Sequence, residues 1–160
     1  MGLPADKAVR YSARIFPSML NGEPEYVTST SPDQRSLEST HILVVDDDSS
    51  IRQMVADYLG DNDMKVTALA SGNDIARVTG QQTIDLLILD LKMPGLDGFD
   101  VLERLQESAA TKLLPVIVLT AKRLTTDERE ELRERAVSLL EKSAYSPQEL
   151  KRLVDRALAQ

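Results

Sequence analysis

The sequence predicts an α/β fold with a doubly wound parallel sheet. From His41 onward, short β-like apolar runs alternate with helix-like runs, which is typical of parallel strands joined by crossover helices. The central runs are apolar at successive positions, as in strands covered by helices on both faces. Four of the runs end at a polar residue, namely Asp46, Asp90, Thr120 and Lys142. Open α/β sheets place their sites beyond the carboxyl ends of the strands, so we expect these side chains to meet.

The composition narrows the class of protein. The 160 residues are enough for one domain with a hydrophobic core. There is no cysteine for disulfides or thiolate chemistry, and one histidine does not favour a histidine metal site. A net charge of −7 argues against nucleic-acid binding, which usually needs a basic patch. No apolar stretch has the length of a membrane span and no signal-peptide pattern opens the chain, so we expect a cytoplasmic protein that does not enter a membrane.

The first 40 residues differ from the rest of the chain. They hold four of the seven prolines, and the stretch TSTSPDQRSLEST is typical of a polar linker. Residues 5–16 place small and apolar side chains near one helical face. We therefore expect residues 1–40 to be a linker-like extension, either a disordered tail or a short docking helix, and residues 41–160 to be the folded domain.

The first half of the domain contains three expected strands and two helices. The strand at about 41–46 precedes a helix for which Ser50 and Gln53 form a capping box, with Asp48 as a further cap or first-turn acid. The expected apolar stripe of this helix is Ile51, Met54, Val55, Tyr58 and Leu59, and Gly60 ends it. A strand at 65–69 follows. A weak helix then runs from Ser71 to Gly80 with Ile75 and Val78 inward, before a strand at 85–90.

The second half repeats the alternation. A turn at Pro94-Gly95 leads to a helix at about 98–107, a strand at 115–120, and a charged helix near 125–135 that opens with Thr125 and Glu128. The last strand, at about 138–141, precedes a helix that starts with SPQE, in which Ser146 caps and Glu149 closes a capping box. The result is (βα)5. Right-handed crossovers then favour the flavodoxin-like strand order 2-1-3-4-5.

This strand order predicts a phosphoryl-transfer site. Asp90 ends the central strand, with Asp46 and Asp47 on one side, Thr120 on the other and Lys142 beyond. Crowded carboxylates need a cation, and oxygen ligands of this kind suit Mg²⁺. Asp90 is the expected nucleophile that forms an acyl phosphate. Lys142 is expected to neutralise phosphoryl oxygens and Thr120 to donate a hydrogen bond to one of them.

Four motifs closely resemble the receiver domain of two-component response regulators over about residues 41–158. They are ILVVDDD, LLILDLKMPGLDGFDVL, PVIVLTAK and AVSLLEKS, in the family's order and at similar spacings. The resemblance implies the following roles: Asp90 as phosphoacceptor, Asp47 as direct metal ligand, Asp46 as an assisting one, the backbone carbonyl of Lys92 as the third protein ligand, Thr120 as switch hydroxyl and Lys142 as the active-site lysine.

The resemblance also implies a function and partners. The chain is then a signalling switch rather than an ordinary enzyme, although it catalyses its own aspartyl phosphorylation and dephosphorylation. A sensor histidine kinase or histidine phosphotransfer protein supplies the phosphoryl group. The helix near 125–135 has few apolar anchors, so this helix and the last strand and helix form the expected partner surface. The sequence is compatible with a monomer and with a homodimer. It is also compatible with a stand-alone receiver and with the C-terminal receiver of a longer hybrid kinase.

Two positions depart from the family pattern. Ser143 replaces the proline that usually follows the lysine, so a trans Lys142–Ser143 bond is expected. Leu139 replaces the usual Tyr or Phe, and Tyr145 is a candidate substitute for that aromatic. Lys92 and Lys122 each follow a site residue by two positions. Two interpretations are open: these lysines affect the access of water to the phosphate, or they are solvated lysines on loops.

Three other functions are alternatives to the signalling switch. A phosphorylation-independent adaptor with the same fold is the alternative that these departures support. A haloacid-dehalogenase-type phosphatase needs a second aspartate where this chain has Lys92. A dinucleotide enzyme is disfavoured because no glycine-rich fingerprint follows the first strand.

Overall fold

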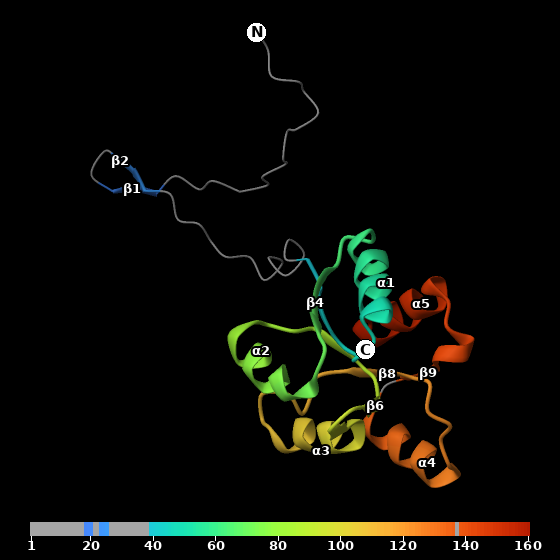
Figure 1. Cartoon of the computed structure of the whole chain (residues 1–160). Coiled ribbons are helices and arrows are strands. Elements are labelled where there is room, and N and C mark those ends of the chain that lie inside the picture. Colours follow the sequence, from blue (N-terminus) through green and yellow to red (C-terminus); the bar gives the residue numbers. More distant parts are fainter. Residues whose placement is uncertain (1–17, 21–22, 26–38, 137) are drawn as a thin grey trace. The chain divides into compact units, whose positions relative to one another are not determined.

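Five parallel strands form the central sheet of residues 39–160, in the order β4-β3-β5-β8-β9 (Figure 1). The structure is a computed structural model that describes residues 18–20, 23–25, 39–136 and 138–160. In order of the chain, these five strands are numbered 2-1-3-4-5, so the predicted flavodoxin-like topology is confirmed. The strands are β3 (His41–Val45), β4 (Lys65–Leu69), β5 (Leu86–Leu89), β8 (Val116–Thr120) and β9 (Ser138–Glu141).

The helices cover both faces of this sheet. They are α1 (Ser49–Gly60), α2 (Ile75–Gln81) after the 3-10 turn η3 (Gly72–Asp74), α3 (Gly98–Glu107), α4 (Thr126–Arg135), and α5 (Pro147–Leu158) after the 3-10 turn η4 (Lys142–Ala144). Alternate residues of β3 and β5 enter two separate core clusters. One cluster joins the sheet to α2, α3 and α4, and the other joins it to α1 and α5 (Figure 1). This two-sided burial explains why the central strands are apolar at every position.

A short hairpin follows β5 and brings α3 close to the end of the sheet. Its strands β6 (Lys92–Met93) and β7 (Leu96–Asp97) are antiparallel, and Pro94-Gly95 forms the expected turn, with Gly95 at a φ of 73°. Such a positive φ favours glycine. The sequence indicated the turn but not the pairing of two residues on each side of it.

Several helix ends differ in detail from the prediction. Of the two cap candidates for α1, Asp48 is the N-cap, since its side chain accepts hydrogen bonds from the backbone N–H groups of Ser50 and Ile51, and Ser50 lies inside the helix. Gly80 lies inside α2, which ends one residue later. Thr125 and Glu128 form the expected capping box of α4. Ser146 caps α5 as expected, but the Glu149 carboxylate binds Arg152, so no reciprocal box forms.

The predicted core faces of the helices are largely confirmed. Val55 and Leu59 of α1, Ile75 and Val78 of α2, and Leu132 of α4 are buried. Met54 was expected in the apolar stripe of α1 but is 38% exposed. It lies in a shallow groove between α1 and the start of α5.

Near the start of the chain, the structure describes one separate pair of strands. The strands β1 (Ser18–Leu20) and β2 (Glu23–Glu25) are antiparallel. The helix proposed for residues 5–16 lies outside the described residues. Within the described ranges, no helix has the length and apolar character to cross a membrane.

Candidate functional site

The candidate site lies where β3, β5, β8 and β9 end. Asp46 follows β3 and Asp90 follows β5, and the two strands are paired in parallel. The backbone N–H of Asp90 donates to the carbonyl of Val45, so the two acids leave the sheet beside each other. Thr120 is the last residue of β8, and Lys142 follows β9 directly. The strand ends therefore assemble these residues as the sequence predicted.

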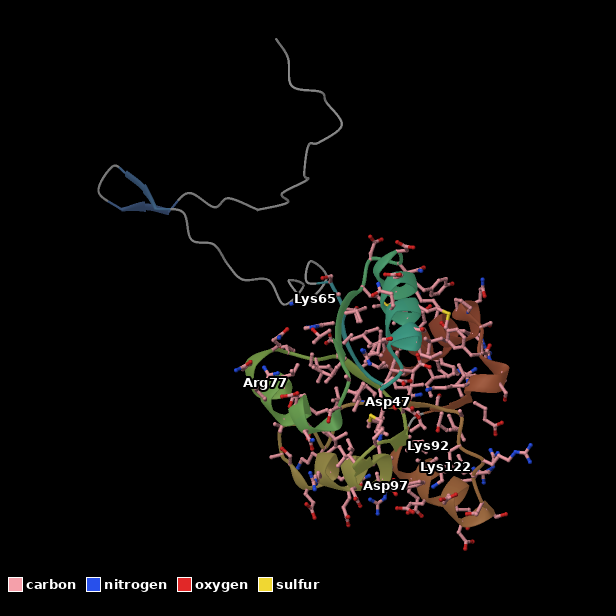
Figure 2. All side chains as sticks on the ribbon, in the orientation of Figure 1. Asp47, Lys65, Arg77, Lys92, Asp97 and Lys122 are labelled. Carbon is pink, nitrogen blue, oxygen red and sulfur yellow. The ribbon has the colours of Figure 1, made fainter. Side chains whose placement is uncertain are left out.

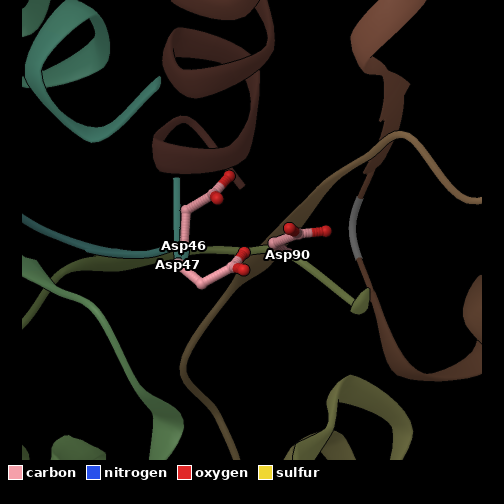
Figure 3. Close-up of side chains that lie close together, drawn as sticks. All are labelled: Asp46, Asp47 and Asp90. Atoms are coloured by element: carbon pink, nitrogen blue, oxygen red, sulfur yellow. The ribbon is translucent and has the colours of Figure 1, made fainter. Parts of the chain in front are cut away.

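Three carboxylates gather at this edge (Figure 3). Asp46, Asp47 and Asp90 each place a carboxylate oxygen within 4.8 Å of the others. Asp46 and Asp90 are buried, whereas Asp47 is exposed. Two of the three carboxylates are thus buried at the end of the sheet, and the third is open to solvent.

Lys142 is the cation of the cluster. Its ammonium group donates to Asp90 Oδ2 at 3.1 Å and lies 2.7 Å from Asp46 Oδ2. Burial alone lowers the pKa of Lys142, but the two carboxylates outweigh it and hold the pKa above its usual value. The lysine therefore stays charged, as a point charge beside Asp90.

Asp46 is held in a position that a cation would stabilise. Burial raises the pKa of its carboxyl group, and the nearby Asp90 charge adds to this, while Lys142 and the backbone N–H of Asp48 oppose it. Oδ1 accepts from that N–H at 2.9 Å. Oδ2 is buried and accepts no well-aligned hydrogen bond, because its contact with Lys142 is an ion pair without hydrogen-bond geometry. A buried carboxylate is costly unless positive charge compensates it, and Lys142 supplies part of that charge here.

The donor set fits a magnesium ion. It consists of oxygen atoms, and the three carboxylates outnumber the one ammonium group. The three carboxylate oxygens lie within 4.8 Å of one another, close enough for one ion to be shared among them. Asp48 uses its carboxylate as the cap of α1 and lies outside the cluster.

Backbone N–H groups position the side chains of Asp90 and Thr120. The N–H of Lys92 donates to Asp90 Oδ1 at 3.1 Å. The N–H of Lys122 donates to Thr120 Oγ1 at 3.1 Å, and Thr120 is fully buried. Ala121, between them, is exposed and lines the adjoining cleft. The metal-ligand role of the Lys92 carbonyl stays a prediction.

Two contacts at the site were not predicted. Arg52 of α1 donates to the backbone carbonyl of Asp46 at 2.6 Å. The Lys122 ammonium group lies 2.6 Å from a Glu128 carboxylate oxygen. Neither pair has a sequence signature, because a loop separates the partners in both cases and only the folded loop brings them together.

The departures at Ser143 and Leu139 have simple structural outcomes. No cis peptide bond occurs among the described residues, so the Lys142–Ser143 bond is trans as expected. Leu139 packs against the core on the side of α2, α3 and α4. Tyr145 packs against the opposite cluster, with α1 and α5. Tyr145 therefore occupies the other face of the sheet and does not replace an aromatic at position 139.

Comparison with known proteins identifies the relatives of this arrangement. The response regulator receiver domain matches residues 42–155. The two-component response regulator ORR5 of Oryza sativa subsp. japonica is 30% identical over 119 residues, which cover 74% of this chain and 88% of ORR5. Regulatory protein VirG of Agrobacterium tumefaciens is 33% identical over 89 residues, or 56% of this chain. This match spans about a third of VirG, at 32% of its length.

Solved structures agree with the sequence matches. The chemotaxis protein CheY4 of Vibrio cholerae superposes with a TM-score of 0.69 and 28% identity, covering 76% of this chain and all of CheY4. A response regulator structure from Chloroflexus aurantiacus gives a TM-score of 0.70 at 30% identity, with 77% of this chain covered. The matched part of the chain thus includes the whole strand-end site.

Proposed function

Because this chain belongs to the response regulator receiver domain family, we propose that it is a signalling switch controlled by phosphorylation of Asp90. The observation that carries the proposal is the contact of Lys142 with both Asp46 and Asp90 beside the exposed Asp47. A buried acid with a fixed cation and an open carboxylate cluster is suited to take up a phosphoryl group. Receiver domains are switches rather than enzymes in the ordinary sense.

The proposed donor is a phosphohistidine on a sensor histidine kinase or histidine phosphotransfer protein. An Asp90 carboxylate oxygen attacks phosphorus, and an O–P bond forms while the P–N bond to the imidazole breaks. The imidazole nitrogen keeps the electron pair of the broken bond and takes up a proton. The product is an acyl phosphate on Asp90.

The remaining residues handle charge. Mg²⁺ held by Asp46, Asp47, Asp90 and the Lys92 carbonyl would neutralise the acids and the incoming phosphoryl oxygens. Lys142 already lies at Asp90 Oδ2 and pairs with a phosphoryl oxygen once the acyl phosphate forms. Thr120 turns its hydroxyl from the Lys122 N–H toward another of these oxygens. Catalysis then comes from positioning and charge neutralisation.

The same proposal assigns the parts of the chain. Residues 41–160 are the receiver domain and residues 1–40 an extension. The protein is cytoplasmic, where a kinase or phosphotransfer protein reaches the open side of the acid cluster. The surface of α4, β9 and α5 changes on phosphorylation and meets a downstream protein or a second copy of the chain.

A mass measurement tests the proposal. The full chain is incubated with acetyl phosphate and Mg²⁺, and its intact mass is expected to rise by one phosphoryl group. Asp90→Asn abolishes the gain, because the amide is not a nucleophile of this kind. The control is Asp97→Asn, since Asp97 caps α3 and asparagine caps equally well. A mass gain that survives Asp90→Asn, or no gain at all, contradicts the proposal.

A phosphorylation-independent adaptor is the second candidate. The observation in its favour is that position 139 holds a partly buried leucine packed against the core, with no aromatic side chain there to move. An adaptor binds its partner equally well before and after acetyl phosphate treatment. A partner captured by the wild type and by Asp90→Asn with equal affinity supports this second candidate.

A further inference from the structure

Lys122 connects the candidate phosphoryl site to α4. Its backbone N–H donates to Thr120 Oγ1 at 3.1 Å, and its ammonium group contacts Glu128 Oε1 at 2.6 Å. The ammonium group also lies 5.2 Å from the centre of the Phe99 ring on α3. One residue thus touches the switch hydroxyl at one end and two helices at the other.

Glu128 serves two partners with one carboxylate. Oε1 binds Lys122, while Oε2 accepts from the backbone N–H of Thr125 at 2.9 Å. The N–H of Glu128 in turn donates to Thr125 Oγ1 at 3.2 Å, which completes the capping box of α4. The start of α4 is therefore bound to the loop after β8 through this carboxylate.

The packing of α4 makes this connection important. Among the described residues of α4, Leu132 alone is buried. An ion pair of 2.6 Å between Arg129 and Glu141 also links α4 to the sheet, and both side chains are more than 40% exposed. A helix with so few anchors opens locally at low free energy, so the loss of one tether affects it measurably.

The position of Lys122 also brings it to the phosphoacceptor side of the domain. Lys122, Lys92 and Asp97 line a cleft of about 480 Å³ beside Ala121 (Figure 2). Lys92 in turn is bound through its N–H to Asp90. A phosphoryl group on Asp90 would add close to two negative charges beside Lys92, one of the residues that line this cleft together with Lys122.

Resting on the function proposed above, we propose that Lys122 exchanges Glu128 for a phosphoryl oxygen on Asp90, and that this exchange loosens the start of α4. The Thr120 hydroxyl releases the Lys122 N–H when it turns to the phosphoryl group, which frees the loop to move. The signal reaches α4 through an ion pair and needs no aromatic at position 139.

Amide hydrogen exchange of the full chain tests this link. The probe is beryllium fluoride with Mg²⁺, which mimics a phosphoryl group on a carboxylate, and its binding is followed by ¹⁹F NMR. In the wild type, we expect the amides of residues 129–132 to exchange roughly two- to fivefold faster when the probe binds, the range for losing one partly exposed ion pair. In Glu128→Gln, these amides already exchange faster without the probe, and the probe adds less than about twofold.

The matched control is Glu131→Gln, the same change on the same helix. Glu131 pairs with Arg135 at a distance of 3.4 Å and does not contact Lys122. This variant is expected to respond to the probe as the wild type does. An unchanged α4 in the wild type with the probe bound, or an equal response in Glu128→Gln, overturns the link and leaves the proposed function standing.

Coupling must also act in the reverse direction. Because Glu128 competes for Lys122, Glu128→Gln is expected to bind beryllium fluoride roughly two- to fivefold more tightly than the wild type. In the Lys122→Met background, Glu128→Gln is expected to leave the affinity for beryllium fluoride unchanged. If the gain persists in the Lys122→Met background, the link is wrong. A wild type that binds no probe and gains no mass from acetyl phosphate overturns the proposed function together with the link.

Discussion

At the scale of single residues, Gly98 sets the distance between the phosphoacceptor and α3. A Cβ at this position would lie 2.5 Å from Leu91 Cα and 3.0 Å from the Asp90 carbonyl oxygen. The first of these separations is too short for a real contact, and the backbone atoms have little freedom to move. The N–H of Gly98 also donates to the Leu91 carbonyl at 3.0 Å. Glycine is thus needed here because helix and strand end approach so closely.

We predict that Gly98→Ala destabilises the domain and impairs phosphorylation. Overpacking of this kind typically costs about 1–3 kcal/mol, and the backbone shift displaces Asp90. The control is Gly80→Ala, where a Cβ meets nothing within 4 Å inside α2. That change is expected to be neutral or stabilising by up to about 1 kcal/mol. Urea unfolding gives the free energies, and equal effects of the two substitutions would contradict the account of Gly98.

Two neighbouring aspartates are predicted to differ in their response to metal. Mg²⁺ is expected to raise the unfolding temperature of the wild type, because ligand binding to the folded state stabilises it. Asp47→Asn should remove most of that rise. Asp48→Asn should retain it, since Asp48 is the α1 cap and asparagine caps as well as aspartate. A thermal melt with and without Mg²⁺ distinguishes these outcomes, and loss of the rise in both variants would reject the assignment.

At the scale of elements, α4 is held to the core by one side chain. We predict that Leu132→Ala costs about 2–5 kcal/mol, the usual range for a buried leucine, and exposes α4 to local unfolding. The control is Leu113→Ala, because Leu113 is 87% exposed. This change is expected to stay within about 0.5 kcal/mol of the wild type. Chemical denaturation measures both, and a mild effect of Leu132→Ala would show that other contacts hold α4.

The elements also show how far sequence reasoning extends. Strand order and the gathering of polar residues at the strand ends were predictable, because apolar runs locate the strands and parallel pairing brings Asp46, Asp90, Thr120 and Lys142 to one edge. The sequence offered both Ser50 and Asp48 as caps of α1, and the backbone angles of the structure select Asp48.

Contacts made by loops were equally hidden from the sequence. The Lys122–Glu128 pair depends on the path of the loop that precedes α4. Periodicity and residue type do not encode such paths, since they arise from packing against the rest of the domain.

At the scale of the whole molecule, His41 ties the opposite end of the sheet together. It begins β3, and its Nε2 lies 2.8 Å from Thr67 Oγ1 on β4. Its Nδ1 lies 3.1 Å from the Thr83 carbonyl oxygen, in the segment before β5. A carbonyl only accepts, so Nδ1 carries the proton and Nε2 of the neutral ring accepts from the threonine hydroxyl. Three segments therefore meet on one neutral imidazole.

This environment predicts a pH dependence of global stability. Burial lowers the pKa of His41, and the Lys65 charge lowers it further, against weaker opposing effects of Thr83 and Asp85. Above the unfolded-state pKa of about 6.5, the ring is neutral in both states and the full stability is present. As the pH falls below that value, the unfolded chain binds the proton first, so the free energy of unfolding decreases by at most about 1.4 kcal/mol per pH unit.

The decrease continues until the folded-state pKa is passed, and carboxylates that titrate at lower pH add their own dependence. Comparison with His41→Gln separates the two contributions, because glutamine can donate and accept but does not titrate in this range. Urea unfolding of both proteins between about pH 7.5 and pH 5 should give a difference in free energy that is flat above about 6.5 and shrinks below it. A difference that stays constant across the series would mean that the histidine does not couple protonation to folding.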